Sequence, residues 1–330
     1  MKLLSVVIPV YNTKPELFRR CLQPLADFDE LEAIIVDDGS QSDAWACLEV
    51  IVRDSLPQAA VYRKENGGQN SARSFGTQRA CGKYTLFLDS DDYLDEEALR
   101  GLLDALGTAD EKIVSFDYQL VHPDGSCFKS IDRWAPGLRP VPMTRAISSC
   151  ESLSLQAYLT DFLKAELPKL YCGVKIGEDL SSALVLLLDA GGMSSCGVNL
   201  YRYVKHGGST LSAPCIDTVF DIQKAFDYVM AHVSDSLDPE SARALSELAV
   251  RHVLYWGGIR SLQCLGYNRR IKRATLQWMD SRVPGWKELV AGAGFEGCNR
   301  MLLSLLANGH WACAAVLVGG WTALSGAQRN

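Results

Sequence analysis

The amino-acid sequence predicts an α/β fold built on a doubly wound, mostly parallel, Rossmann-like sheet with a helical C-terminal region. Two observations predict it. Apolar, β-branched runs alternate with helix-length segments through the first third of the chain, as in parallel sheets covered by helices. From about Asp217 onward the sequence carries helical periodicity alone. We therefore expect one domain over residues 1–212 and a helical region over residues 213–330.

The expected elements follow one another closely up to residue 121. Leu3–Val10 is a β-branched run, typical of a strand buried on both faces. Thr13 and Glu16 have the spacing of a capping box, so Thr13 is expected to cap the next helix. Further strands are expected at 31–38, 59–64, 84–89 and 112–121, and further helices at 43–54, 69–81 and 96–106.

The pattern weakens after residue 121. Residues 131–150 contain three prolines and predict a loop that passes over a cleft at the sheet edge. Helices are expected at 153–163 and 178–191, and a last strand at 197–206.

Composition narrows the possible classes of protein. The chain has 330 residues, of which 48% are hydrophobic and 22% charged, as in ordinary globular proteins. Its net charge of −6 argues against a general nucleic-acid binder, so no nucleic-acid partner is expected. The 11 cysteines include no CxxC pair, so most are expected to be buried apolar residues in a reducing, cytoplasmic environment. No apolar run approaches the roughly 18–20 residues of a spanning helix.

A cluster of acids follows the strand expected at 84–89. Asp89, Asp91 and Asp92 lie so close together that their charges repel one another. A hard divalent cation such as Mg²⁺ or Mn²⁺ would offset this repulsion and leave coordination positions for phosphate oxygens. A solvated turn, in which Ser90 or Asp92 caps the following helix, fits the same pattern. Because ligands bind at the carboxyl ends of parallel strands, these acids are expected to line a cleft.

Five segments, in this order, resemble the family 2 glycosyltransferases with a GT-A fold. The segments are SVVIPVYN (5–12), VDDGSQSD (36–43), ENGGQNSARSFG (65–76), DSD (89–91) and KIGEDL (175–180). The resemblance implies an inverting transferase that moves a sugar from a nucleotide diphosphate, in particular UDP, to a hydroxyl group. The implied acceptor is a glycan or a lipid-linked molecule, as in polysaccharide or cell-surface glycan synthesis, and the implied cofactor is Mn²⁺ or Mg²⁺.

The resemblance assigns the nucleotide pocket to Pro9, Tyr11 and Asp38. A carboxylate at Asp38 can accept the uracil imide proton, and Tyr11 offers an aromatic face. Gly68 and Arg73 are implied to lie near the nucleotide sugar, although a helix-surface position for Arg73 fits the sequence as well.

The same resemblance places the metal beside the DSD segment. Asp91 matches the metal-binding acid, and Asp89 is implied to contact the metal, the ribose or the sugar, with Ser90 beside it. After the last expected strand, Lys205 could bind the diphosphate and His206 the metal. A solvated loop is the alternative for these last two residues.

Asp179 matches the family's catalytic base, which takes the proton of the attacking acceptor hydroxyl. Glu178 is then its supporting neighbour, and a simple helix start is the alternative for both acids. Members of the family often carry a Trp-x-Lys-Leu-Tyr-like segment before the base, and Gln156 falls about where its lysine is expected. Ser74 likewise replaces the asparagine that usually follows the arginine.

Two further questions stay open at the level of sequence. The altered Ser74 and Gln156 also fit a catalytically degenerate protein that binds a nucleotide sugar and acts as a partner or regulator. The basic run NRRIKR (268–273) could attach the C-terminal region to anionic lipid, which would place the protein peripherally on the inner face of the membrane. A solvated helix face fits that run equally well.

Overall fold

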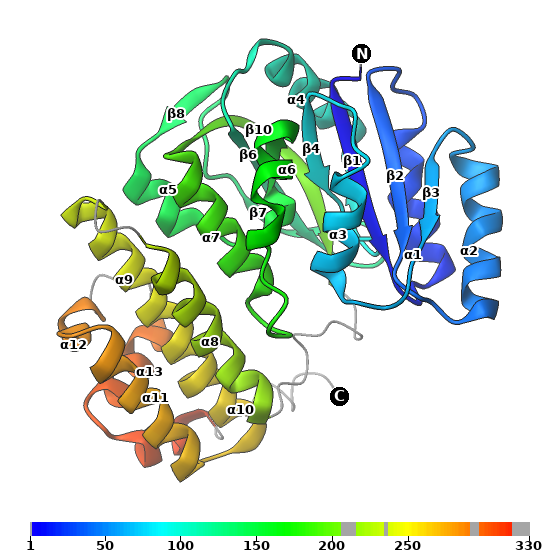
Figure 1. Cartoon of the computed structure of the whole chain (residues 1–330). Helices are drawn as coiled ribbons and strands as arrows, with labels where there is room; N and C mark the ends of the chain where they lie inside the picture. The colour runs from blue at the N-terminus through cyan, green and yellow to red at the C-terminus, as the bar shows by residue number, and fades with distance from the viewer. Residues whose placement is uncertain (1, 206–215, 234–236, 291–296, 319–330) are drawn as a thin grey trace. The chain divides into compact units, whose positions relative to one another are not determined.

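The computed structural model describes residues 2–205, 216–233, 237–290 and 297–318, and the chain divides into two compact units (Figure 1). The first unit contains the sheet and comprises residues 1–146, 150–172 and 182–207. The second unit comprises residues 147–149, 173–181 and 208–330. The predicted domain boundary at residue 212 stays a prediction.

The first unit is organised by one mixed sheet whose strand order is β3-β2-β1-β4-β9-β6-β10-β5. Strand β1 (Leu4–Val10) lies between β2 (Leu31–Asp37) and β4 (Tyr84–Phe87), and both run parallel to it. Strand β3 (Ala60–Arg63) continues the parallel half beyond β2. The predicted α/β fold is confirmed, and this half has the expected parallel pattern.

The other half of the sheet contains antiparallel pairs. Strand β9 (Gln156–Leu159) is antiparallel to β4 and to β6 (Ile113–Val121), and β10 (Met193–Val204) is parallel to β6. Strand β5 (Tyr93–Leu94) is antiparallel to β10, and β7 (Cys127–Ile131) to β6. The prediction of a mostly parallel sheet therefore holds for β3, β2, β1 and β4 and for the β6–β10 pair alone.

Two predictions for the middle of the chain are wrong. Residues 131–150, expected as a loop, contain β8 (Arg139–Val141) and α5 (Met143–Ser149), because β8 pairs with the start of β10. The helix expected at 153–163 is a 3-10 turn, strand β9 and helix α6 (Thr160–Glu166). The backbone of β9 fills the position between β4 and β6, and a local apolar pattern cannot reveal such a partner.

Helices cover both faces of the sheet. Helices α1 (Pro15–Leu22), α2 (Ser42–Ser55) and α4 (Glu96–Thr108) contribute apolar side chains to the main core, together with alternate residues of β1. Helix α3 (Gln69–Thr77) packs on the opposite face. At Gly76 of α3 an added Cβ would lie 2.4 Å from a methyl carbon of Val7, so this close helix–sheet contact requires glycine.

Two smaller predictions about side chains are also wrong. Helix α1 has Lys14 rather than Thr13 at its N-cap, with no side-chain cap, and Pro15 occupies the first turn, where its missing N–H removes no helix hydrogen bond. Among the nine cysteines that the structure describes, Cys21, Cys150 and Cys196 are buried and the other six are exposed.

The second unit is helical in its described part from residue 216 on, as predicted. Its helices are α8 (Ile216–His232), α9 (Pro239–Leu254), α10 (Ser261–Leu265), α11 (Arg269–Arg282), α12 (Trp286–Leu289) and α13 (Gly297–Ala307). Asp238 caps α9 and Asn268 caps α11 through their side chains. No helix in the described ranges is both long enough and apolar enough to cross a membrane.

Candidate functional site

The predicted site residues of the first unit gather at one edge of its sheet. Strands β1, β2 and β4 are parallel, and β9 is antiparallel to both β4 and β6, so β6 and its parallel partner β10 end at the same edge. Tyr11, Asp38, Asp89 and Lys205 each follow the end of one of these strands. The edge is therefore the place where a ligand can touch all four loops.

Pro9 and Tyr11 have different environments. Pro9 is buried in β1 opposite Val36, beyond the point where β1 pairs with β4, so its missing N–H interrupts no ladder. Tyr11 is 57% exposed, so its ring is accessible from solvent at the edge of the sheet.

Hydrogen bonds tie the loops after β1, β2 and β4 together. The Asn12 N–H donates to Ser40 Oγ at 2.8 Å, and Asn12 Oδ1 accepts from the Gln41 N–H at 2.9 Å. Asn12 has a φ of 48°, a left-handed conformation that asparagine tolerates. The hydroxyl oxygens of Thr13 and Ser90 are 2.6 Å apart. Ser90 therefore anchors the DSD turn to the loop after β1.

Asp38 shapes the glycine-rich loop before α3. Its carboxylate is nearly buried and accepts hydrogen bonds from the N–H groups of Gly67 and Gly68, the latter at 2.8 Å. Lys64 Nζ lies 2.6 Å from Asp38 Oδ1. Gly68 has a φ of 86°, and an added Cβ there would meet no atom within 4 Å. The structure thus gives Asp38 a loop-ordering role, while its contact with uracil stays a prediction.

Arg73 is fully buried, which excludes a surface position for it. Its Nη2 donates to Asp89 Oδ1 at 2.8 Å, and Gln69 Nε2 donates to the same oxygen at 2.6 Å. A guanidinium group cannot lose its proton in a protein, so burial requires a carboxylate and further acceptors. Asn70 Oδ1 and Ser154 Oγ supply these acceptors at 3.0 and 3.3 Å.

Asp92 differs from the other two acids of its cluster because it is turned into the protein. It is 3% exposed and accepts hydrogen bonds from Tyr201 Oη at 2.9 Å and from the Val204 N–H at 2.7 Å. Burial raises the pKa of Asp92 well above its usual value, and the charges of Asp91 and Asp89 raise it further. Asp92 thus fastens the end of β10 to the turn after β4.

Lys205 is a cationic residue that directly follows the end of β10 at this edge. Desolvation lowers the pKa of its ammonium group, and the nearby Asp92 carboxylate opposes that shift. Its Nζ lies 4.5 Å from the centre of the Tyr203 ring. His206, the other predicted ligand in this loop, lies outside the described residues.

The acids at this edge fit a hard divalent cation that also takes ligands from its substrate. Asp89 and Asp91 are partly exposed, whereas Asp92 is buried, so two acids of the cluster are accessible from solvent. Mg²⁺ is commonly bound by one or two protein carboxylates together with substrate phosphates and water. Within the described ranges, no three His, Cys, Asp or Glu side chains form a group that could hold a metal ion by themselves. Asp89 and Asp91 could therefore hold such a cation only together with ligands from a substrate or water.

Asp179 and Glu178 occupy the first turn of α7 (Glu178–Ala190), in the part of the chain that belongs to the second unit. The expected helix at 178–191 is therefore confirmed. Acidic side chains are favourable in a first helical turn, so this position alone explains their presence. The role of Asp179 as a base stays a prediction.

The assignment of Gln156 to the Lys-Leu-Tyr position is wrong. Gln156 begins strand β9, and the chain carries the triplet itself at Lys169–Tyr171, shortly before Glu178. Lys169 forms ion pairs with Glu166 at 2.7 Å and Asp189 at 2.9 Å. The triplet itself is a signal that the sequence contains.

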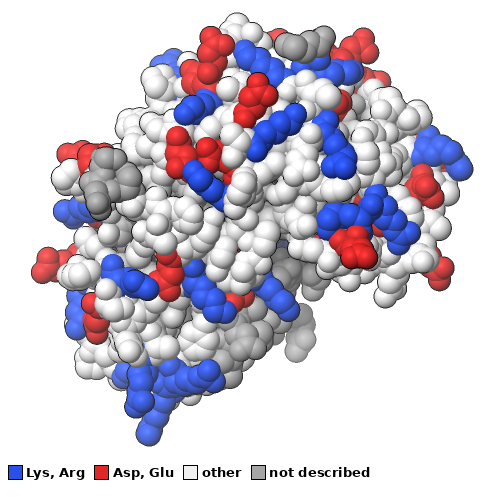
Figure 2. Space-filling view, viewed as in Figure 1, with Lys and Arg blue, Asp and Glu red and all other residues white. Residues whose placement is uncertain are grey.

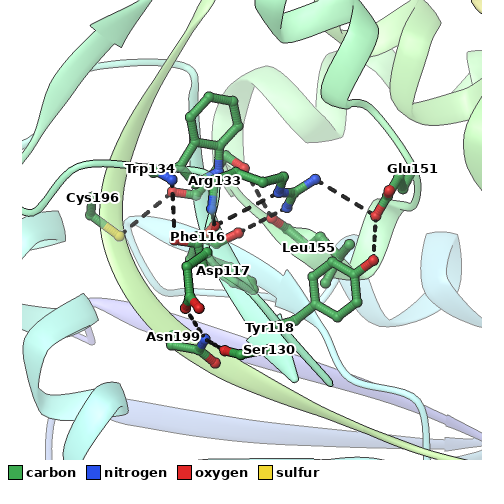
Figure 3. Close-up of polar contacts among 12 residues, drawn as sticks. Phe116, Asp117, Tyr118, Ser130, Arg133, Trp134, Glu151, Leu155, Cys196 and Asn199 are labelled. Atoms are coloured by element: carbon green, nitrogen blue, oxygen red, sulfur yellow. Dashed lines mark hydrogen bonds and ion pairs between the residues drawn. The ribbon is translucent and has the colours of Figure 1, made fainter. Parts of the chain in front are cut away.

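A second polar cluster lies beside β6 and is shown in Figure 3. Asp117 is 2% exposed and accepts hydrogen bonds from the N–H groups of Arg133 and Trp134 at 2.9 and 3.3 Å. Burial raises the pKa of Asp117. Tyr118 Oη donates to Glu151 at 2.7 Å, and Arg133 reaches the same carboxylate at 3.7 Å. These contacts hold residues 132–134 against the strand.

The chain matches a family model and named relatives over its N-terminal part. Residues 5–134 match the model described as glycosyl transferase family 2. This stretch is therefore similar to the family 2 glycosyl transferases. An uncharacterized glycosyltransferase of Haemophilus influenzae is 32% identical over 100 residues, 30% of this chain and 40% of its own length. A poly(ribitol-phosphate) beta-glucosyltransferase of Bacillus spizizenii is 36% identical over 101 residues, 29% of this chain and 16% of its own length. The chain thus spans well under two thirds of these relatives.

Solved structures show the fold over nearly the whole chain. S. aureus TarS in complex with UDP-GlcNAc has a TM-score of 0.70 at 20% identity, covering 98% of this chain and 92% of that chain. A mannosyltransferase from Pyrobaculum calidifontis in complex with GDP-Man and Mn²⁺ has a TM-score of 0.52 at 15% identity, covering 97% and 87%. The GT-A fold is therefore confirmed, and the stretch that matches the family model contains the Asp38 loop, the Arg73–Asp89 pair and the DSD turn.

Replacing Asp38 separates its two roles. In Asp38→Asn, one amide hydrogen faces the Gly67–Gly68 N–H groups, and an unsatisfied buried donor costs about 1–3 kcal/mol. We expect a lower melting temperature and UDP binding at least about tenfold weaker, measured by thermal unfolding and calorimetry.

Lys64→Met is the control, because it removes the ammonium contact but leaves both loop N–H groups bonded, and its effects should be smaller. An unchanged melting temperature for Asp38→Asn, with a change only in the preference for UDP over GDP, would contradict the loop-ordering role.

Proposed function

We propose that the protein is an inverting glycosyltransferase that moves a sugar from a nucleotide diphosphate, UDP in particular, to a hydroxyl of a glycan or lipid-linked acceptor. One observation carries the proposal. The Asp38 loop, the Arg73–Asp89 pair and Lys205 converge on the carboxyl edge of the sheet, where α/β sheets bind nucleotides. The family match and the TarS structure with UDP-GlcNAc support this assignment.

The donor would lie along this edge with its base beside Tyr11 and Asp38. The exposed Tyr11 ring can stack on uracil, and Asp38 holds the loop that closes this end of the pocket. Arg73 fixes the carboxylate of Asp89 toward the ribose and sugar, with Ser90 and Gly68 nearby. Lys205 would offset the charge of the diphosphate. These contacts would orient the anomeric carbon. Holding the reacting atoms in the right geometry lowers the reaction barrier, because their translational and rotational entropy has already been lost on binding.

Asp91 and Asp89 would hold Mn²⁺ or Mg²⁺, with His206 as a further ligand in the proposal. When bound, the ion supplies Lewis-acid stabilisation of the charge that develops on the leaving diphosphate. Burial raises the pKa values of Asp92 and of the Cys21 thiol, and the charges of the nearby acids Asp91 and Asp89 raise both further. A cation at this edge would offset the part of these shifts that comes from the charges of the acids.

Asp179 would act as the general base. An ionised carboxylate takes the proton of the acceptor hydroxyl while that oxygen attacks the anomeric carbon from the side opposite the diphosphate, which inverts the configuration. Glu178 would support it. The name of the Bacillus spizizenii relative, a poly(ribitol-phosphate) beta-glucosyltransferase, supports a hydroxyl-rich polymer as the acceptor class.

The metal assignment predicts a specific dependence on Asp91. Asp91→Asn should weaken UDP binding at least about tenfold in saturating Mn²⁺, because it removes one of two carboxylate ligands. In EDTA the variant and the wild type should bind UDP with nearly equal affinity. Calorimetric titration in both buffers measures this, and equal affinity in Mn²⁺ would show that Asp91 is not a ligand.

The base assignment predicts a loss of rate without a loss of binding. General-base catalysis contributes roughly 10²–10⁴ in rate, so Asp179→Asn should slow transfer by about that factor while UDP affinity in Mn²⁺ stays nearly unchanged. Glu178→Gln is the matched control and should be much milder. Near-normal transfer by Asp179→Asn would exclude it as the base. A wild type that binds UDP but turns over no sugar donor would favour the degenerate, regulatory alternative.

The proposal includes a cytoplasmic location with peripheral attachment through the helical unit. Helix α11 starts with Arg269, Arg270, Lys272 and Arg273, which we call the basic corner. Cations are unfavourable at a helix N-terminus, so helix stability does not explain them. Leu265 and Tyr267 are exposed just before the corner, and Figure 2 shows Lys and Arg gathered at the lower end of this unit.

Attachment to lipid predicts flotation that depends on charge. The protein should float with phosphatidylglycerol vesicles at low salt and release at high salt, because exposed charges are then screened. A triple Glu substitution of Arg269, Arg270 and Arg273 should abolish flotation. The same charge change at Arg243, Arg282 and Lys287 is the control and should retain most of it. Equal loss in both triples, or no flotation of the wild type, would leave the solvated-face interpretation in place.

A further inference from the structure

Asn70 uses both ends of its side-chain amide in a buried position. It lies in the first turn of α3 and is 2% exposed. Its Oδ1 accepts a hydrogen bond from Arg73 Nη1 at 3.0 Å. Its Nδ2 donates to the carbonyl oxygen of Tyr171 at 2.8 Å and lies 3.3 Å from Ser182 Oγ. One amide thus joins two parts of the first unit that are about a hundred residues apart in sequence.

These contacts form a continuous path, which we call the Asn70 link. At one end Arg73 carries the path to Asp89 through their 2.8 Å ion pair. At the other end Ser182 also accepts a hydrogen bond from the Tyr171 N–H at 2.9 Å. Arg73 and Ser182 are fully buried, so the path is shielded from water, and hydrogen bonds in such surroundings are strong and directional.

The sequence departs from the family pattern next to the arginine of this link. Ser74 stands where the family pattern usually has asparagine after the arginine. Here an amide reaches the guanidinium group of Arg73 from one turn earlier in α3, at Asn70. Unlike a residue that only fills space, Asn70 offers an acceptor to one segment and a donor to another, so its two ends can be separated by substitution.

We propose that Asn70 is a positioning residue that sets the orientation of Arg73, and through it Asp89, together with that of Tyr171 and helix α7. The inference rests on the proposed function, because Asp89 belongs to the proposed donor site. Asp179 lies three residues before Ser182 on the same helix. One side chain therefore contacts both the arginine that pairs with Asp89 and Ser182 of the helix that carries the proposed base.

Asn70→Asp separates the two ends of the link. The aspartate keeps an oxygen that can accept from Arg73. Its second oxygen takes the place of Nδ2, which lies 2.8 Å from the Tyr171 carbonyl oxygen, so these two oxygens repel each other. We expect UDP affinity in Mn²⁺ within about threefold of wild type and a kcat for sugar transfer or donor hydrolysis lowered about 10- to 100-fold, as for small misplacements of reacting groups. Asn70→Ala should lower both the UDP affinity and kcat.

Two further variants distinguish positioning from simple destabilisation. Ser182→Ala should lower kcat in the wild type but add little in Asn70→Asp, because both changes break the same path. Thr77→Val is the matched control: Thr77 is buried on the same helix and donates to the Arg73 carbonyl at 2.8 Å. It should lower the melting temperature while kcat stays within about twofold.

A readout without turnover keeps this inference separate from the proposed function. UDP with Mn²⁺ should slow hydrogen exchange over residues 171–182 in the wild type and not in Asn70→Asp. Absence of this protection in the wild type, or a kcat within twofold of wild type for Asn70→Asp, overturns the positioning role. A wild type that shows the protection but turns over no sugar donor contradicts the proposed function and supports the link.

Discussion

The buried ion pair between Arg73 and Asp89 is the interaction on which the rest of the site depends. Arg73 is fully buried and permanently charged. The elements around it must therefore supply hydrogen-bond acceptors for its guanidinium group. Asp89 follows β4, and α3 packs so closely on the sheet that position 76 must be glycine. Breaking such a pair would leave an uncompensated charge in the interior, which is strongly destabilising. The pair thus joins the fold and the site.

The acids at this edge divide into two groups with different tasks. Asp38 and Asp92 are buried, and their oxygens accept hydrogen bonds from backbone N–H groups. Asp38 thereby holds the Gly67–Gly68 loop in place, and Asp92 holds the end of β10. Asp89 and Asp91 are partly exposed beside them. This division explains how a cluster of like charges is tolerated, because Asp38 and Asp92 are hydrogen-bonded in the interior, Arg73 pairs with Asp89, and Asp89 and Asp91 remain partly exposed.

The sequence allowed the parallel half of the sheet and its edge to be predicted, because β-branched runs and the acids that end them are local signals. Strand β9 could not be predicted, since its pairing with β4 and β6 depends on partners far away in sequence. Burial of Arg73 was equally hidden, because a helix that begins in a glycine-rich loop has no local sign of its packed face. Asn70 lies in one of the segments that resemble the family. Its partners, Tyr171 and Ser182, are far away in sequence and could not be predicted from that segment.

In our proposal, the carboxyl edge of the sheet is a donor site for a nucleotide diphosphate and a divalent cation. A crystal structure with UDP and Mn²⁺ tests it most directly. The account predicts uracil beside Tyr11 and Asp38, the cation on Asp91, and the diphosphate within reach of Lys205. Nucleotide density elsewhere in the molecule, or a cation bound without contact to Asp91 or Asp89, would contradict it.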